Sequence, residues 1–237
     1  MASGINDRGE IVGSYDDSAG THGFHLRNGE FATIDFPGAT FTMAFGIGPS
    51  GAVVGAYRRE GEAAVNYHGF LRTSDGRFER VDAPPYKNTI AQRILPDGTV
   101  LGCRHADDFG ASMRGAVLTP QKYSETAAFG SMHNGATPDL RRVVGLYNFA
   151  PGDRSAAYTI DDGRFIPLVV PGSTATSAWD VNPAGVTVGT YRDSAGVHGF
   201  VLTHAGFVPL NAPGAMTTRA LGINSNGAVV GSFEAGG

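Results

Sequence analysis

The chain has 237 residues, with 22 acidic and 18 basic side chains and a net charge of −4 at pH 7. This balance argues against a nucleic-acid or anionic-membrane partner. Met1–Asn6 carries no signal-peptide pattern, no apolar run is long enough to span a bilayer, and the single cysteine, Cys103, allows no internal disulfide.

One short phrase, an apolar pair closed by glycine and usually followed by an aromatic residue, occurs six times along the chain. We call its glycines the marker glycines: Gly13, Gly55, Gly102, Gly145, Gly189 and Gly231. Their successive spacings are 42, 47, 43, 44 and 42 residues. A period in the low forties, filled with short apolar runs and turn residues, predicts the blades of a β-propeller.

The second repeat shows most clearly how one blade is built. Four strands are predicted in it, separated by Gly, Pro, Ser and Asp turns: Met43–Gly48, Ala52–Arg58, Tyr67–Thr73 and Arg77–Asp82. The first is small and apolar, which suits a crowded inner strand, and the last alternates like a half-exposed outer strand. We therefore expect an all-β fold of four-stranded blades.

The third and fourth repeats depart from this pattern. The outer strand after Arg114–Leu118 is weakly marked, and Gly130–Arg142 replaces the usual tight inner turn with a longer excursion. Such a break has two interpretations. It reflects either ordinary sequence drift with a loop insertion, or residues that are needed for function and have replaced the repeat pattern.

The repeats predict one domain over residues 1–237, divided at about 4–45, 46–92, 93–135, 136–179, 180–221 and a partial 222–237. Five blades are expected, with six as the alternative. In a five-bladed ring the strand pair ending near Phe233 is redundant, whereas in a six-bladed ring it is a half-built blade.

Three phrases together resemble the bacterial HAF-type extracellular repeat proteins. The first repeat contains all three, as GINDRGEIVG, HGF at His22–Phe24 and TIDFPGA. The HGF phrase recurs as YHGFL in the second repeat and as VHGFV in the fifth, and the first phrase recurs as GINSNGAVVG at Gly222–Gly231. The resemblance covers most of the chain and fails in 104–142. It implies a propeller in an exported protein and implies no particular reaction.

Candidate ligand-binding residues follow the marker glycines and the predicted inner strands. Two positions after the marker glycine, the residue is Tyr15, Tyr57 or Tyr191 in three of the repeats. These aromatic residues either pack in the core or form a flat surface on which a sugar ring stacks. The next position is polar and changes between repeats, as in Asp16, Arg58 and Arg192, either because it is solvated or because each blade supplies one group to an asymmetric site. Near the axis, Arg93, Trp179 and Arg219 suggest a polar mouth for a hydroxylated or anionic ligand.

The strongest chemical cluster is His105 and Asp107 beside Cys103, with His133 in the irregular loop and Asp16 as a further carboxylate. An imidazole near a carboxylate can act as a general base, although acidic clusters are also common in exposed loops. Cys103 is expected to be a small buried residue. His22, His68 and His198 recur at strand starts and are expected to hold blades together. No metal-ligating residues are assigned, and the sequence leaves the cofactor and the metal content unknown.

Three functions remain open at this stage. The first is binding of a small polar or carbohydrate-like ligand at the axial mouth. The second is a hydrolase or lyase that uses a His/carboxylate pair in the same cavity, and the third is a protein-interaction scaffold. The expected partner is a small molecule or glycan, with no nucleic acid and no membrane, and the oligomeric state is left open.

Overall fold

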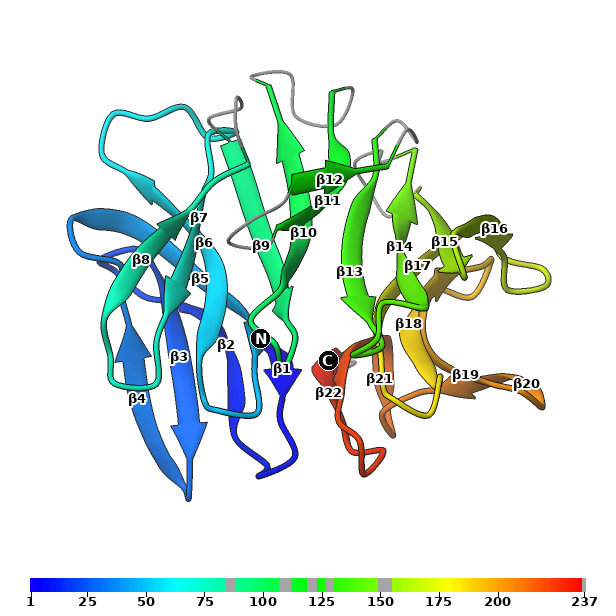
Figure 1. Ribbon diagram of the computed structural model, residues 1–237. Helices are drawn as coiled ribbons and strands as arrows, with labels where there is room; N and C mark the ends of the chain where they lie inside the picture. The colour runs from blue at the N-terminus through cyan, green and yellow to red at the C-terminus, as the bar shows by residue number, and fades with distance from the viewer. Residues whose placement is uncertain (84–87, 107–111, 119–122, 127–129, 149–154, 236–237) are drawn as a thin grey trace.

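The computed structural model describes residues 1–83, 88–106, 112–118, 123–126, 130–148 and 155–235. Within these ranges the backbone forms 22 β-strands and no helix, so no helix there is long and apolar enough to cross a bilayer. The strands form twisted, mainly antiparallel sheets set around a central axis (Figure 1). The predicted all-β propeller fold is confirmed.

Each of the first three units has four strands in chain order from the axis outward. Unit 1 contains β1 (Ala2–Ile5), β2 (Ile11–Asp16), β3 (Thr21–Arg27) and β4 (Glu30–Ile34). Unit 2 contains β5 (Ala39–Ile47), β6 (Val53–Arg59), β7 (His68–Arg72) and β8 (Phe78–Val81). Unit 3 contains β9 (Asn88–Ile94), β10 (Val100–His105), β11 (Arg114–Leu118) and β12 (Tyr123–Glu125).

The remaining strands form two further four-stranded units and one strand pair. Unit 4 contains β13 (Met132–Ala136), β14 (Arg142–Tyr147), β15 (Ala156–Asp161) and β16 (Arg164–Leu168). Unit 5 contains β17 (Ala175–Val181), β18 (Thr187–Arg192), β19 (Val197–Thr203) and β20 (Gly206–Leu210). Unit 6 contains β21 (Ala215–Ile223) and β22 (Val229–Ala235). The strands predicted for the second repeat are found, except that β5 begins four residues earlier, at Ala39.

Six inner strands surround the axis, so the favoured count of five blades is corrected. The strands β1, β5, β9, β13, β17 and β21 contact one another in cyclic order, with β21 between β17 and β1. Asn224 donates its side-chain amide to the carbonyl of Asn6 at 3.1 Å, just as Asn182 donates to Asn224 at 3.3 Å. The β21–β22 pair is therefore a member of the ring, and the chain ends lie close together in Figure 1.

A shared backbone feature explains the marker glycines. In all six units the inner strand carries a register shift opposite its second strand, where one extra residue bulges out of the ladder. The bulge brings an inner-strand carbonyl against the marker glycine: a Cβ on Gly55 would overlap the carbonyl of Met43, and one on Gly231 that of Arg219. Only glycine fits there, which is why the phrase recurs once per unit.

Adjacent blades pack face to face through apolar side chains. Val12 and Ile34 of unit 1 form one cluster with Val53, Tyr57 and Phe70 of unit 2. On the second and third strands of each blade, the face on the side of the marker glycine therefore packs against the preceding blade. Equivalent clusters recur around the ring, so the core lies between blades and the axis is left for other side chains.

Candidate functional site

A cavity of about 250 Å³ lies on the propeller axis. Its walls come from all six inner strands: Met1, Ser3, Phe45, Ile90, Gln92, Arg93, Met132, Trp179, Arg219 and Leu221. Five of these, Ser3, Phe45, Gln92, Trp179 and Leu221, are the bulged residues of their strands. A bulge changes the direction of its residue's side chain. The same bulges that require the marker glycines therefore point these five side chains toward the axis.

Arg93 closes one end of this cavity, and each Nη of its guanidinium group donates to two backbone carbonyls. Nη1 donates to the carbonyls of Phe45 (2.7 Å) and Gln92 (2.9 Å), and Nη2 donates to those of Ser3 (3.1 Å) and Leu221 (2.6 Å). Nε lies 3.2 Å from Oδ2 of Asp180. Arg93 thus joins unit 3 to units 1, 2, 5 and 6, and both of its Nη groups are occupied by backbone carbonyls.

Glycines make room for the Arg93–Asp180 pair. The residue after the bulge is Arg93 in unit 3 and Asp180 in unit 5, and in the other four units it is Gly4, Gly46, Gly135 or Gly222. A Cβ on Gly135 would stand 2.7 Å from Oδ1 of Asp180, and one on Gly46 would stand 3.0 Å from Cα of Arg93. The six positions that follow the bulges form one layer across the axis. This layer is too narrow for six side chains and holds the Arg93–Asp180 ion pair instead.

Asp180 is fixed by the backbone as well as by Arg93. Its Oδ1 accepts from the N–H of Val181 and its Oδ2 accepts from the N–H of Ile223, both at 3.0 Å. Burial raises the pKa of the Asp180 carboxyl, and the nearby Arg93 charge opposes that effect.

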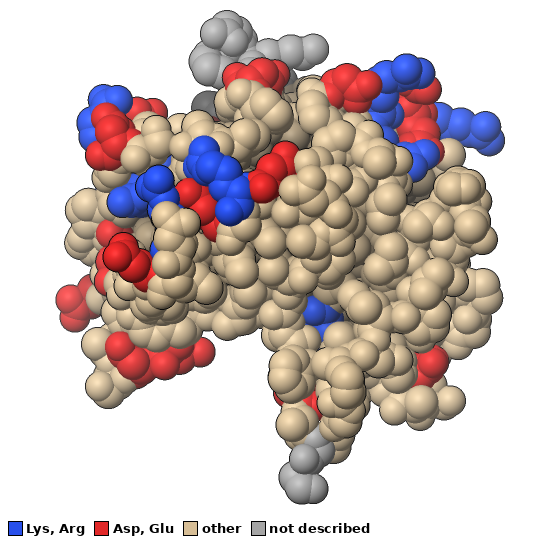
Figure 2. Space-filling view, turned by 90° about the horizontal axis from the view of Figure 1, so that it is seen from below, with Lys and Arg blue, Asp and Glu red and all other residues tan. Residues whose placement is uncertain are grey.

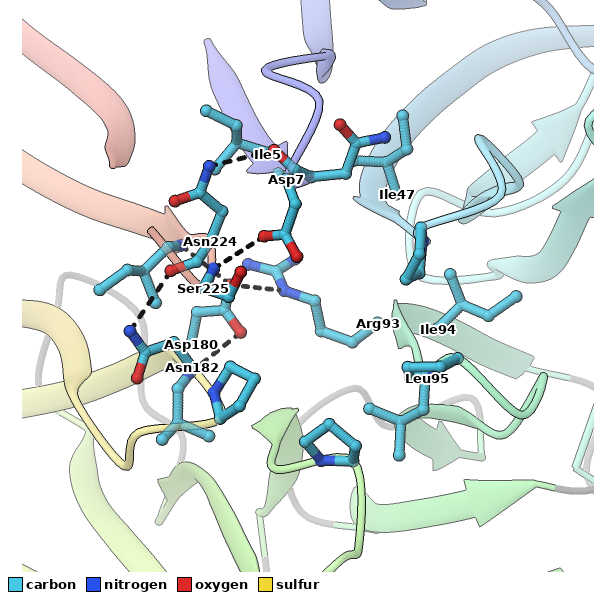
Figure 3. Close-up of a pocket in the computed structure, with 18 of the residues that line it drawn as sticks. Ile5, Asp7, Ile47, Arg93, Ile94, Leu95, Asp180, Asn182, Asn224 and Ser225 are labelled. Atoms are coloured by element: carbon cyan, nitrogen blue, oxygen red, sulfur yellow. Dashed lines mark hydrogen bonds and ion pairs between the residues drawn. The ribbon is translucent and has the colours of Figure 1, made fainter. Parts of the chain in front are cut away.

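A smaller hollow of about 140 Å³ lies on the other side of Arg93 (Figure 3). The tight inner turns form it, and Ser225 donates its N–H to Asp7 while Asn182 and Asn224 link neighbouring turns. Figure 2, which views the molecule from below, shows basic atoms at the centre of this face, and Arg93 is the cation that lines this hollow. The lower hollow is the smaller of the two, at about 140 Å³ against about 250 Å³, so we place the candidate site in the larger axial cavity.

Two predicted binding residues, Trp179 and Arg219, do line the axial cavity. Trp179 donates its indole N–H to the hydroxyl of Thr190 at 3.1 Å, which fixes the ring on the wall. Nη1 of Arg219 lies 3.5 Å from Oε1 of Glu234 on β22. These two side chains give the mouth an aromatic wall and a positive charge.

The three predicted tyrosines instead pack within and between blades. Each stands opposite the histidine of its HGF phrase, with ring centroids 5.3 Å apart for Tyr15 and His22, 5.2 Å for Tyr57 and His68, and 5.1 Å for Tyr191 and His198. Tyr57 is fully buried and stacks on Phe36 of the preceding blade at 3.7 Å. None of the three lines the axial cavity.

The polar residues after the tyrosines also lie off the axial cavity. Arg58 donates to the carbonyl of Ala64 at 2.9 Å and covers the ring of Phe41 at 4.7 Å. Asp16 accepts from the hydroxyl of Thr21 at 2.6 Å, and Arg192 ends β18. They belong to three different units, so the structure does not gather them into one site.

The predicted histidine bases are buried in the blades. His133 contacts the hydroxyl of Tyr158 through Nδ1 at 2.5 Å, and burial lowers its pKa to about 4. His105 is fully buried at the end of β10, with Nδ1 2.7 Å from the carbonyl of Ala106. Asp107 lies outside the described residues. Neither histidine lines the axial cavity, so the predicted acid–base pair is not assembled there.

Cys103 is buried as expected, and burial raises the pKa of its thiol to about 12. Its role in packing is therefore confirmed. Among the residues that the structure describes, no three His, Cys, Asp or Glu side chains gather in a way that could hold a metal ion.

The sequence interpretation missed several cavity residues, among them Met1, Phe45 and Leu221. It also placed Arg93 at the mouth, whereas the structure places it across the axis. The bulge position is a signal that finds Phe45 and Leu221 but not Met1, because it lies ten residues before the marker glycine in five of the six units, at Ser3, Phe45, Gln92, Trp179 and Leu221.

No family model and no curated protein matches the chain. Solved structures do match it, at low sequence identity. A TolB from Acinetobacter baumannii has a TM-score of 0.65 at 14% identity over 89% of this chain, which spans only 54% of that protein. A putative TolB from Agrobacterium tumefaciens has a TM-score of 0.66 at 14% identity over 98% of this chain and 88% of that one.

A gluconolactonase from Xanthomonas campestris also shares the fold, with a TM-score of 0.58 at 14% identity over 98% of this chain and 83% of that one. These neighbours include hydrolases as well as other propeller proteins. At such identities the likeness shows the β-propeller fold and transfers no activity.

Proposed function

We propose that this chain is a binding protein that holds one small ligand in the axial cavity. The observation that carries the proposal is the cavity itself, where bulged residues from different blades converge on about 250 Å³ of space. Ligand sites usually measure about 300–1,000 Å³, so the ligand is expected to be small.

The lining indicates the chemistry of the ligand. Phe45, Ile90, Met132, Trp179 and Leu221 offer apolar surface, and Gln92 and Arg219 offer hydrogen-bond donors. This combination favours a molecule with one apolar or C–H-rich face and one anionic or hydrogen-bond-accepting group. A sugar acid or a small aromatic acid has both features.

The enzyme alternative has less support because His133 is held neutral in the core and His105 is buried away from the cavity. The resemblance to exported HAF-type repeats supports placing the binding activity outside the cytoplasm. It supports no particular ligand.

Binding of four probes, benzoate, phenyl phosphate, gluconate and glucose, tests the proposal by isothermal titration and by chemical-shift changes at the Trp179 indole N–H. At least one anionic probe is expected to bind and to shift that resonance. Arg219→Gln should weaken its binding by about tenfold or more, because a charge-assisted hydrogen bond is lost.

The matched control is Arg164→Gln, since Arg164 is exposed on β16, away from the axial cavity. It should bind like the parent. Binding that survives Arg219→Gln, or that leaves the Trp179 resonance unmoved, would contradict a site at the axis.

A further inference from the structure

A groove of about 390 Å³ lies between units 1 and 2 and shares no lining residue with the axial cavity. It opens on the face formed by the tight inner turns and by the hairpins between third and outer strands. Figure 2, which views this face, shows basic and acidic atoms gathered on the side where Figure 1 places units 1 and 2. The charged and titratable residues that line the groove are Arg8, Glu10, His25, Arg27, Glu30 and Arg72.

Two of these side chains stand where the other blades carry mostly apolar residues. His25 lies on the third strand of unit 1, opposite the residue before the marker glycine, and Arg72 lies one position further along the third strand of unit 2. In units 2 to 5 the position of His25 is taken by Leu71, Val117, Thr159 and Val201. In units 1, 3, 4 and 5 the position of Arg72 is taken by Leu26, Leu118, Ile160 and Leu202.

These two positions meet across the interface between neighbouring blades. Between units 3 and 4 they hold Val117 and Ile160, which pack in one apolar cluster, and the corresponding leucines of units 2 and 3 do the same. Between units 1 and 2 the pair is an imidazole and a guanidinium group, and the interface opens into the groove. Because partly burying such polar groups costs free energy unless they find partners, the exchange points to a role other than packing.

The imidazole of His25 is left unsatisfied within the described residues. Its side chain is 14% exposed, and its buried Nε2 has no hydrogen-bond partner there. Oε2 of Glu10 is 3.7 Å from Nε2, which is beyond hydrogen-bonding distance. His22 and His198, in contrast, each have partners at both ring nitrogens. An unpartnered ring nitrogen in a polar groove indicates that a molecule from outside the chain completes its hydrogen bonding.

A buried carboxylate fixes two arginines on the unit 1 side of the groove. Glu10 is 4% exposed and accepts a hydrogen bond from Nδ2 of Asn6 at 2.8 Å. Nη2 of Arg8 lies 2.8 Å from its Oε2, and Nε of Arg27 lies 3.1 Å from its Oε1. A guanidinium group has five N–H donors, so both arginines keep donors beyond those that Glu10 accepts.

On the unit 2 side, Arg72 has no carboxylate partner among the residues that the structure describes. Its guanidinium group lies 6.0 Å from the centroid of the Phe78 ring, and the hydroxyl-bearing Ser50 and Ser74 also line the groove. With Glu30 as the second carboxylate, three guanidinium groups meet two carboxylates here, in a molecule whose net charge is −4. This local excess of positive charge favours an anion.

We propose that the groove between units 1 and 2 binds a phosphate or sulfate group, either as the free ion or as the end group of an ester. Guanidinium groups bind such oxyanions through charge-assisted hydrogen bonds, and an oxyanion with three or more acceptor oxygens satisfies donors on both walls at once. The volume of about 390 Å³ lies in the range of small-molecule sites, about 300–1,000 Å³, and leaves room for the rest of an ester.

Isothermal titration at constant ionic strength tests the proposal with three probes: sulfate, phenyl phosphate and acetate. Binding of sulfate would show that the free ion suffices, and binding of phenyl phosphate without sulfate would show that the group is taken as the end of an ester; either result supports the proposal. Acetate, with two oxygens and one charge, should bind at least about tenfold more weakly. Because phenyl phosphate also probes the axial cavity, its titration is repeated in Arg219→Gln, where binding in the groove should persist.

Variants of the two exchanged positions locate the site. Arg72→Leu installs the residue that units 1, 3 and 5 carry there, so the circular dichroism spectrum should be unchanged while the dissociation constant rises by about tenfold or more. His25→Val installs the residue of units 3 and 5 and should raise it by about threefold or more. The matched control is Arg77→Leu, which removes the same charge from an exposed arginine paired with Asp75 outside the groove and should bind like the parent.

A parent protein that binds neither sulfate nor phenyl phosphate at millimolar concentration would overturn the proposal. So would acetate that binds as tightly as the other two probes, or binding that Arg72→Leu leaves intact. Equal weakening by Arg72→Leu and Arg77→Leu would show a general charge effect without a site, and would equally overturn it. None of these outcomes bears on the axial cavity, which Arg72 does not line.

Discussion

His133 shows how the environment of one side chain decides between chemistry and packing. From the sequence, a histidine in an irregular segment is a candidate base. In the structure its ring packs against Gly115 of the neighbouring unit, where a Cβ would stand within 3.0 Å of three ring atoms, and its Nδ1 meets the Tyr158 hydroxyl. Desolvation lowers its pKa to about 4, so the ring is neutral at physiological pH.

The buried imidazole should make stability depend on pH. Its folded pKa of about 4 lies below the ordinary value of 6.5, so its contribution is complete above pH 6.5 and is lost as the pH falls toward 4. Between pH 7.5 and 4.5 it should remove about 2–3 kcal/mol from the free energy of unfolding. Urea denaturation of the parent and of His133→Gln at both pH values measures this. Between the two pH values, the variant should lose about 2–3 kcal/mol less of its free energy of unfolding than the parent loses. Equal losses in the two proteins would contradict a buried neutral histidine.

At the scale of strands and turns, much of the fold is predictable from the sequence because one local constraint repeats. The inner-strand bulge forces a glycine opposite it, the turn residues separate the strands, and the HGF phrase places an aromatic on the third strand. The strands of the second repeat follow from these signals alone. The site was less predictable, because which side chains reach the axis depends on the bulges. Their offset of ten residues from the marker glycine becomes useful only once the strand pairing is known.

The HGF histidines connect elements as the sequence predicted. His198 contacts Asn211 at the end of the outer strand at 3.1 Å and Asp193 after the second strand at 3.2 Å. His22 does the same with Asp35 and Asp17, and the Asp35 hydrogen bond, aided by both carboxylate charges, raises the pKa of His22. Each imidazole thus joins two connections of one blade.

Removing one such connection should cost measurable stability without unfolding the ring. His198→Ala loses both contacts and should lower the free energy of unfolding by about 1–2 kcal/mol. His204→Ala, in the exposed hairpin of the same unit, is the matched control and should change it by less than about 0.5 kcal/mol. Chemical denaturation at pH 7 compares them, and equal effects would mean that the connection contributes nothing.

At the scale of the whole molecule, the ring is held from its centre as well as through its blade interfaces. Arg93 binds backbone carbonyls of three other units and the carboxylate of a fourth. The half-built sixth unit is among those it holds, through the carbonyl of Leu221. The same guanidinium group forms the floor of the axial cavity, so the stability of the ring and the shape of the candidate site depend on one ion pair.

Replacing the cation should therefore destabilise the molecule in a way that acid partly reverses. Arg93→Met leaves the Asp180 carboxylate buried without its partner, which typically costs about 3–5 kcal/mol. Burial already raises the pKa of Asp180, and loss of the Arg93 charge removes the effect that opposed it, so the carboxyl takes up a proton as the pH falls. The difference in unfolding free energy between parent and variant should be largest at pH 7.5 and should shrink by pH 5. The exposed Arg164→Met is the control and should differ little from the parent at either pH. A cost for Arg93→Met that is small, or the same at both pH values, would show that the ring does not depend on this pair.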